Sequence, residues 1–123
     1  MPWELDGDRP IYAQLVECVT LDILAGRFPA GGRLPSVREL AAEAGVNPNT
    51  MQRALAQMEQ DGLICTQRTA GRTVTEDQSR VEAARKTLAQ ERTRTYLMDM
   101  AKLGFGPEHL PELLRTLSKE RTE

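Results

Sequence analysis

Two short helical patterns joined by a tight turn restrict the fold of this chain more than any other feature. The first pattern, SVRELAAEAG, opens with the capping-box pair Ser36 and Glu39 and ends at Gly45, a residue suited to a left-handed stop. Asn47 can cap a second helix, and Pro48 fits its first position because no N–H is needed there. Two short helices joined by a tight, glycine-containing turn form a helix-turn-helix.

The flanking segments extend this motif into a winged helix. Upstream, PIYAQLVECVTLDILAG predicts a helix between Pro10 and Gly26. Its apolar residues fall on one face at helical spacing: Ile11, Leu15, Val19 and Ile23. Downstream, LICTQ and TVT predict two short strands around the turn RTAGR. A helix-turn-helix followed by a small hairpin is a winged helix.

The remainder of the chain predicts a polar linker and a helical tail. Ser79 and Glu82 offer another capping box, so we expect a helix over about residues 80–103. PEHLPELLRTLSK predicts a last helix, and the short connection favours an antiparallel hairpin. The expected fold class is mostly α. We expect a winged helix-turn-helix DNA-binding domain at 1–75, a linker at 76–79 and a two-helix dimerisation tail at 80–123.

The second helix of the motif has one apolar face and one polar face. On a helical wheel with about 100° per residue, Met51, Leu55 and Met58 fall on the inner side. The outer side carries Asn49, Gln52, Arg53, Ala56 and Gln60, with Thr50 on its flank. Amides, guanidinium and hydroxyl groups are the types that read base edges. The acids Glu59 and Asp61 lie at the far end, whereas recognition helices enter the groove with their N-terminal residues.

Positive charge has to be well placed for this chain to bind DNA, because its formal net charge is −2. Ser36 and Arg38 open the first helix of the motif, and Arg68 and Arg72 bracket the wing tip. Together with Arg53, these arginines can form one cationic surface. Two alternatives stay open: a polar face that is merely solvated, and a winged-helix protein–protein interaction module without sequence-specific DNA binding. The second would more often expose a large apolar anchor on this helix.

The chain resembles the GntR family of transcription regulators. The similarity rests on PIYAQL, LPSVRELA, GVNPNTMQRAL and DGLICTQR, in that order, and it covers the chain from Pro10 to about Thr75. The short C-terminal part and the NPNT stretch are similar to the YtrA-type subgroup, whose members end in a two-helix dimerisation tail. The resemblance implies a winged helix-turn-helix fold. It also implies DNA contacts by Ser36, Arg38, Asn49, Thr50, Gln52 and Arg53, together with the wing.

The wing departs from the family's pattern of Gly, basic residue, Gly, Thr and Phe. Here Thr69 stands where a glycine is common, and Thr73 stands where a phenylalanine is common. Minor-groove contact by Gly71 and Arg72 is expected on this basis, but the hairpin has lost two residues that usually shape it. The sequence therefore predicts a wing that is less well anchored.

The tail carries more apolar residues than a two-helix hairpin can bury alone. The residues expected to need a partner are Leu88, Leu97, Met100, Leu103, Leu113, Leu114 and Leu117. A symmetric homodimer would cover them and double the DNA contacts. Packing back onto the winged helix is the intramolecular alternative. The tail is too small to enclose a metabolite pocket alone, although a cleft between two copies for a small-molecule effector stays open.

Other classes of function find little support. There is no phosphate-binding glycine loop, no convincing nucleophile with a histidine, and no cluster of metal ligands, so we expect neither an enzyme nor a metal or cofactor site. Cys18 and Cys65 are expected to be small buried hydrophobes in a reducing compartment. Without a leader or an apolar run of membrane length, the expected location is the cytoplasm.

These observations predict a sequence-specific DNA-binding transcription regulator. We expect a homodimeric repressor that binds a palindromic double-stranded DNA operator and blocks access to the promoter. The recognition helix, residues 48–61, and the wing, residues 68–73, are the expected contacts.

Overall fold

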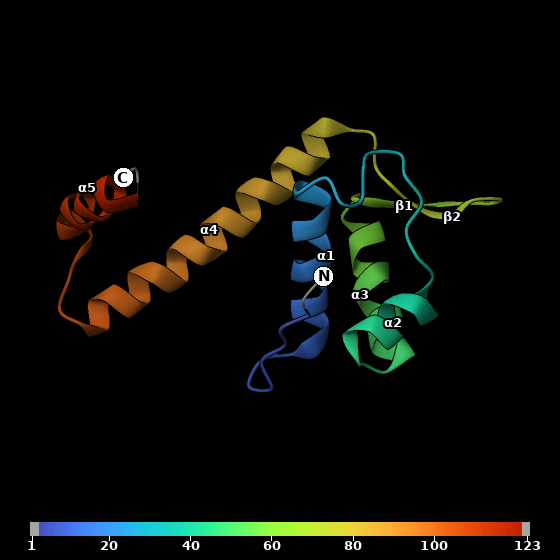
Figure 1. The fold of residues 1–123 in the computed structure, drawn as a ribbon, viewed down its shortest axis with the longest axis horizontal. Coiled ribbons are helices and arrows are strands. Elements are labelled where there is room, and N and C mark those ends of the chain that lie inside the picture. Colours follow the sequence, from blue (N-terminus) through green and yellow to red (C-terminus); the bar gives the residue numbers. More distant parts are fainter. Residues whose placement is uncertain (1–2, 122–123) are drawn as a thin grey trace. The chain divides into compact units, whose positions relative to one another are not determined.

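The computed structural model describes residues 3–121 and confirms a mostly helical chain with a two-stranded wing (Figure 1). Its elements are α1 (Ile11–Leu24), α2 (Val37–Ala44), α3 (Pro48–Gln60), β1 (Ile64–Gln67), β2 (Gly71–Val74), α4 (Gln78–Lys102), the 3-10 turn η1 (Pro107–His109) and α5 (Leu110–Arg121). The chain divides into two compact units between Lys86 and Thr87. Over the described residues, none of the helices has both the length and the apolar character needed to cross a membrane.

The predicted caps of the helix-turn-helix all form. The Ser36 hydroxyl accepts the Glu39 N–H at 3.1 Å, and the Glu39 carboxylate accepts the Ser36 N–H at 3.3 Å. Gly45 ends α2 with a φ of 72°, in the left-handed region. The Asn47 side chain accepts the Asn49 N–H at 2.7 Å, and Pro48 occupies the first turn of α3. Short-range hydrogen bonds therefore fix both helices and the turn.

The core of the first unit lies where α3 packs against α1 and α2. Met51, Leu55 and Met58 are 0% exposed, as the helical wheel predicts. They meet buried residues of the other elements, among them Leu15, Val19, Ile23, Leu40, Ala41, Leu63, Ile64 and Val74. Full burial of a leucine or methionine side chain stabilises a fold by about 1.5–3 kcal/mol. This packing holds the inner face of α3, so its outer face is left for solvent.

A third backbone segment supports the wing. β1 and β2 pair antiparallel with Gln67 opposite Gly71, and an isolated bridge joins Arg33 to Thr73 on the other edge of β2. The Leu34 N–H donates to the Arg72 carbonyl at 2.9 Å, and the Gly31 N–H donates to the Val74 carbonyl at 2.9 Å. The segment before α2 thus pairs with β2, which anchors the wing despite its altered turn sequence.

The start of α4 differs from the predicted capping box. Asp77, and not Ser79, caps the helix: its carboxylate accepts the Ser79 N–H at 3.0 Å and the Ser79 hydroxyl at 2.6 Å. These hydrogen bonds, led by the one from the Ser79 side chain, lower the pKa of Asp77. Val81 is buried and Ala84 packs against the core. The first turns of α4 therefore belong to the first compact unit.

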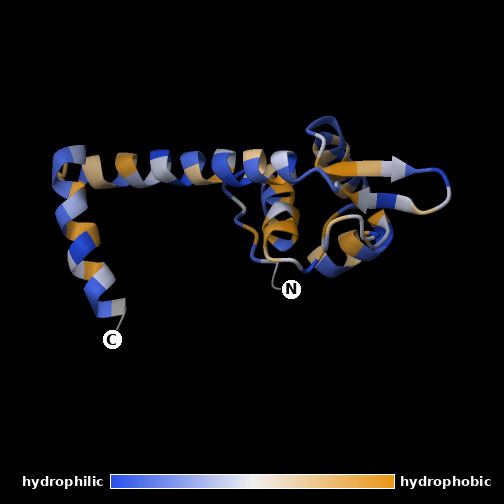
Figure 2. Cartoon of the chain, turned by 90° about the horizontal axis from the view of Figure 1, so that it is seen from above, coloured by the Kyte–Doolittle hydropathy of each residue, from blue (hydrophilic) through white to orange (hydrophobic). Residues whose placement is uncertain are grey.

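Both predicted tail helices form, in a more open arrangement than an antiparallel hairpin. Within the second unit, α5 does not lie along α4, and in Figure 2 it leaves the end of α4 in a different direction. Leu110 is the one buried residue among residues 87–120. The short connection predicts that α4 and α5 pack side by side. With so few buried apolar residues in this unit, little apolar contact holds the two helices together.

The prediction for the cysteines is wrong in part. Cys18 on α1 is half-buried, whereas Cys65 on β1 is exposed. Only Ile64 of β1 is buried, because the rest of the strand extends away from the core. The apolar residues of the LIC stretch therefore predicted more burial of β1 than the structure shows.

A buried carboxylate lies near the end of α1. The Asp22 side chain is 7% exposed, and its Oδ1 accepts a hydrogen bond from Arg27 Nη1 at 3.3 Å. Its Oδ2 is buried without a hydrogen-bond partner in the described chain. Burial raises the pKa of Asp22, and the nearby Arg27 guanidinium only partly opposes this.

We expect Asp22→Asn to make the protein more stable than wild type at pH 7. Because the folded pKa is raised, the stabilising contribution of Asp22 is fully present below its unfolded pKa and is lost as the pH rises through its folded pKa. The advantage of the variant should therefore shrink as the pH falls towards about 4. Urea unfolding at one protein concentration across this range measures it. Asp8→Asn, on the exposed arm, controls for lost charge, and an Asp22→Asn advantage independent of pH would contradict the prediction.

Candidate nucleic-acid interface

The outer face of α3 presents the polar row that the sequence predicts. Asn49, Gln52 and Arg53 are exposed and Thr50 is half-buried, with Ala56 and Gln60 exposed further along. Since Met51, Ala54, Leu55 and Met58 hold the opposite face in the core, this row has a fixed direction. It offers two amides and a guanidinium near the N-terminus of the helix.

Arg53 has a partner that the sequence did not suggest. Its guanidinium carbon lies 4.0 Å from the centre of the Tyr12 ring, over its face. Tyr12 belongs to α1, so the contact links two helices far apart in sequence. A cation–π contact of this kind restricts the rotamers of a long side chain. The arginine of the row is therefore held against the body of the protein.

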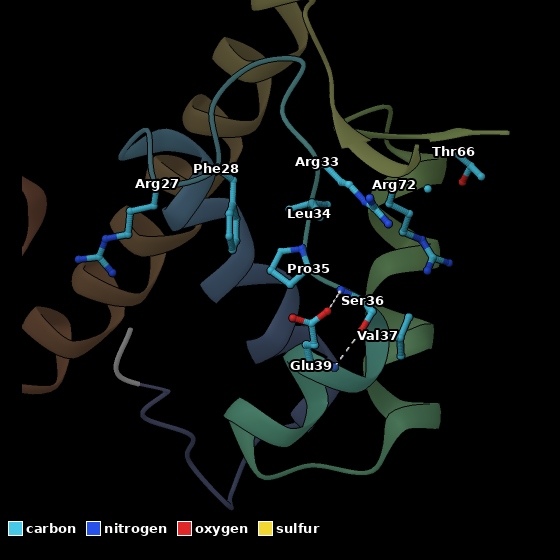
Figure 3. A pocket seen from close by; sticks show the side chains of 11 residues that line it. Arg27, Phe28, Arg33, Leu34, Pro35, Ser36, Val37, Glu39, Thr66 and Arg72 are labelled. Carbon is cyan, nitrogen blue, oxygen red and sulfur yellow. Dashed lines mark hydrogen bonds between the residues drawn. The ribbon is translucent and has the colours of Figure 1, made fainter. Parts of the chain in front are cut away.

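A groove of about 790 Å³ separates the N-terminus of α2 from the wing (Figure 3). Its walls include Phe28, Leu34 and Ser36 on one side and Thr66, Gly71 and Arg72 on the other. Ser36, which was predicted to contact DNA, opens α2 at this groove, and Arg38 is exposed two residues further along. The residues that line the groove come from the segment before α2, from α2 itself and from the wing.

Three arginines line the groove, but two of them are engaged by acids. Arg27 pairs with Asp22, and Arg72 Nε donates to Glu59 Oε1 at 2.5 Å. Arg33 forms no ion pair with any residue in the described part of the chain. Figure 3 shows Arg33 and Arg72 together at the wing side, with Arg27 apart on the side of α1. Arg33 thus supplies the available positive charge of the groove.

The wing residues are divided by the structure. Arg68 is exposed in the turn, whereas Gly71 and Arg72 lie in β2. Gly71 has a φ of 74°, a conformation that strongly favours glycine at this end of a three-residue hairpin loop. An added Cβ there would lie 4.0 Å from Arg33 Nε, so the arginine side chain reaches towards the wing.

Three residues contribute to this surface without having been predicted from the sequence: Tyr12, Arg33 and Glu59. Arg33 sits in the glycine- and proline-rich RFPAGGRLP segment, which reads as a plain loop. An arginine between glycines and a leucine gives no local signal of strand pairing. Tyr12 and Glu59 act through contacts with distant parts of the chain, which periodicity does not reveal.

The residues predicted for dimerisation are largely uncovered. Leu97, Leu103, Leu114 and Leu117 are exposed, the last at 60%. Leu88, Met100 and Leu113 are half-buried. Met98 and Phe105 add to the exposed apolar surface. Figure 2 shows such residues interspersed with polar ones along both tail helices.

Comparison with known proteins gives concordant results. The family model described as "Bacterial regulatory proteins, gntR family" matches residues 11–74. The HTH-type transcriptional regulator YhcF of Bacillus subtilis is 30% identical over 94% of this chain and 96% of its own. The HTH-type transcriptional repressor YtrA of the same bacterium is 31% identical over 93% of this chain and 88% of its own. A GntR family transcriptional regulator from Listeria monocytogenes superposes with a TM-score of 0.80 and 38% identity, covering 91% of this chain and 98% of that structure.

Proposed function

The chain belongs to the gntR family of bacterial regulatory proteins, with relatives that include YtrA, and from this premise we propose that it is a homodimeric repressor of transcription. In this proposal each protomer binds one half of a palindromic DNA operator. Residues 1–75 bind DNA, residues 76–79 connect, and residues 80–123 join the two protomers. DNA binding and transcription regulation are the common property of the family.

The observation that carries the proposal is the exposed polar row of α3. Asn49 and Gln52 have side-chain amides that can bond adenine in the bidentate manner, and Arg53 can do the same with guanine. Thr50 on the flank can meet a phosphate or a thymine methyl group. A row without a large apolar anchor suits the polar major groove better than a protein partner.

Phosphate binding in this proposal falls to groups around the row. Arg38 and Arg68 are exposed, and Ser36 opens α2, whose N-terminus favours an anion. Arg33 joins them from the groove. Phosphate contacts position the helix, while the amides and Arg53 supply the sequence preference.

In this proposal, dimerisation covers the exposed apolar surface of the tail. Leu103, Leu114 and Leu117 together would leave a large apolar area in water if the unit stayed alone. A second copy offers the same residues and is therefore self-complementary. Twofold symmetry would place two recognition helices on successive turns of the major groove.

Arg53→Ala should weaken binding to a selected DNA duplex by roughly ten- to hundredfold and relax the preference at one base pair, because a bidentate base contact is lost. The duplex would come from binding-site selection with the wild-type protein, and fluorescence anisotropy would measure affinity. Arg85→Ala removes an exposed arginine whose partner is Glu82 on the same helix, so it controls for net charge. Equal affinities of the two variants would contradict base reading by Arg53.

Arg33→Ala should weaken binding to every duplex by a similar factor. The physical reason is the loss of one phosphate contact, which also reduces the slope of log affinity against log salt by roughly one. Anisotropy titrations at several salt concentrations, on selected and scrambled duplexes, give both quantities. An unchanged slope would mean that Arg33 does not contact the backbone.

Leu117→Glu should convert the protein from dimer to monomer at micromolar concentration, because a carboxylate would be buried at the interface. Size-exclusion chromatography with light scattering measures the mass. Arg115→Glu introduces the same side chain on another face of α5 and should leave the dimer intact. A wild-type protein that is already monomeric would refute this role of the tail.

A further inference from the structure

The Glu59 carboxylate connects the end of α3 to both strands of the wing. Arg72 of β2 donates its Nε–H to Glu59 Oε1 at 2.5 Å. Thr66 lies directly opposite Arg72 on β1, close enough to Glu59 to help lower the pKa of its carboxyl. Glu59 therefore lies against both strands of the wing, which also pack on α3 through Ile64 and Val74 in the core.

The contact has the features of a strong ion pair. The side chains of Arg72 and Glu59 are 21% and 31% exposed, so water screens this pair only in part. The hydrogen bond from Arg72 is the largest cause of a lowered pKa at Glu59, followed in the same direction by Thr66. The carboxylate is thus ionised at neutral pH. Charge-assisted hydrogen bonds of this kind are stronger than neutral ones.

The pairing also decides what Arg72 is free to do. Because its Nε–H and its charge are engaged by Glu59, Arg72 attracts a phosphate less strongly than an unpaired arginine would. Arg68 in the turn carries its charge without such a restraint, since it is exposed and forms no ion pair in residues 3–121. The two arginines of the wing are therefore not equivalent.

We propose that Glu59, Thr66 and Arg72 form a wing clasp that fixes the wing against the recognition helix, so that Arg72 is a positioning residue and not a DNA contact. The clasp rests on the proposed DNA-binding function for its consequence. The clasp thus assigns a structural role to an acid at the end of α3. Glu59 orients the part of the wing that carries Arg68.

Loss of the Glu59 charge should change DNA affinity in the direction opposite to the one expected from simple electrostatics. Removing a negative charge near a DNA surface should raise affinity, and releasing Arg72 should raise it further. If the clasp orients the wing, the same change should lower affinity, because the loosened hairpin has to be ordered again upon binding. The two views predict opposite effects of one substitution.

The decisive variant is Glu59→Gln in the full-length protein, with Asp61→Asn as the matched control. Asp61 is exposed and accepts a hydrogen bond only from Gln57 among the described residues, so its variant removes the same charge without touching the wing. With a duplex selected by the wild-type protein, Glu59→Gln should lower affinity about tenfold. Asp61→Asn should leave it unchanged or slightly raised. Higher affinity of Glu59→Gln would overturn the clasp.

A double-mutant cycle separates positioning from direct contact. If Arg72 acts through Glu59, then Arg72→Ala, Glu59→Gln and the double variant should all lower affinity by a similar factor. If Arg72 binds DNA itself, Arg72→Ala should lower affinity in the Glu59→Gln background as well, and the two effects should add. Additive effects would reject the positioning role.

Amide hydrogen exchange without DNA tests the clasp independently of the proposed function. Glu59→Gln should speed exchange of the inter-strand amides in residues 64–74 about tenfold, with α1 and α3 unaffected and Asp61→Asn like wild type. Unchanged exchange in the wing would refute the clasp. Failure of the wild-type protein to select any duplex would instead refute the proposed DNA binding, while the exchange result would still decide the clasp.

Discussion

The two-sided packing of α3 is the constraint on which the rest of the structure depends. Met51, Leu55 and Met58 are fully buried, and Ala54 lets the helix approach its neighbours closely. This contact buries one face of α3 and gives the opposite, polar face a fixed direction. The methionines and leucine on the buried side set the direction of the polar row proposed to read DNA, and Tyr12 further holds Arg53. A rigid apolar contact is therefore the source of any sequence specificity, although no apolar residue would touch a base.

The placement of acids matters as much as the placement of arginines in a chain with a net charge of −2. Asp22 and Glu59 each engage one arginine of the groove, so only Arg33 keeps its charge available there. Counting basic residues would assign the groove three cations. The pairing reduces this number and shifts the electrostatic attraction for an anion towards Arg33, Arg38 and Arg68.

The parts of the fold that depend on neighbours in sequence were predictable. Ser36 with Glu39, Gly45, and Asn47 with Pro48 specify α2, the turn and α3 through hydrogen bonds and backbone preferences within a few residues. The bridge of Arg33 to Thr73 and the pairing of Arg72 with Glu59 join distant segments, so periodicity gave no sign of them. The same limit explains the exposed Cys65 and the open tail, since both depend on which surface covers a segment. For the candidate site, the sequence predicted which residues of α3 face outward but not the contacts that orient them.

Helix α4 contributes residues to both compact units of the chain. Its first turns are held by the core through Val81 and Ala84, and Arg80 lies against Gly62 just after the end of α3. Its later turns carry exposed apolar residues, among them Leu97 and Met98. Gly62 has a φ of 83°, a conformation that favours glycine, and the Arg80 side chain lies beside it. One continuous helix thus begins beside the end of α3 and continues into the tail. If two tails associate as proposed, the helix that receives the partner is the same one whose first turns pack into the core that holds α3.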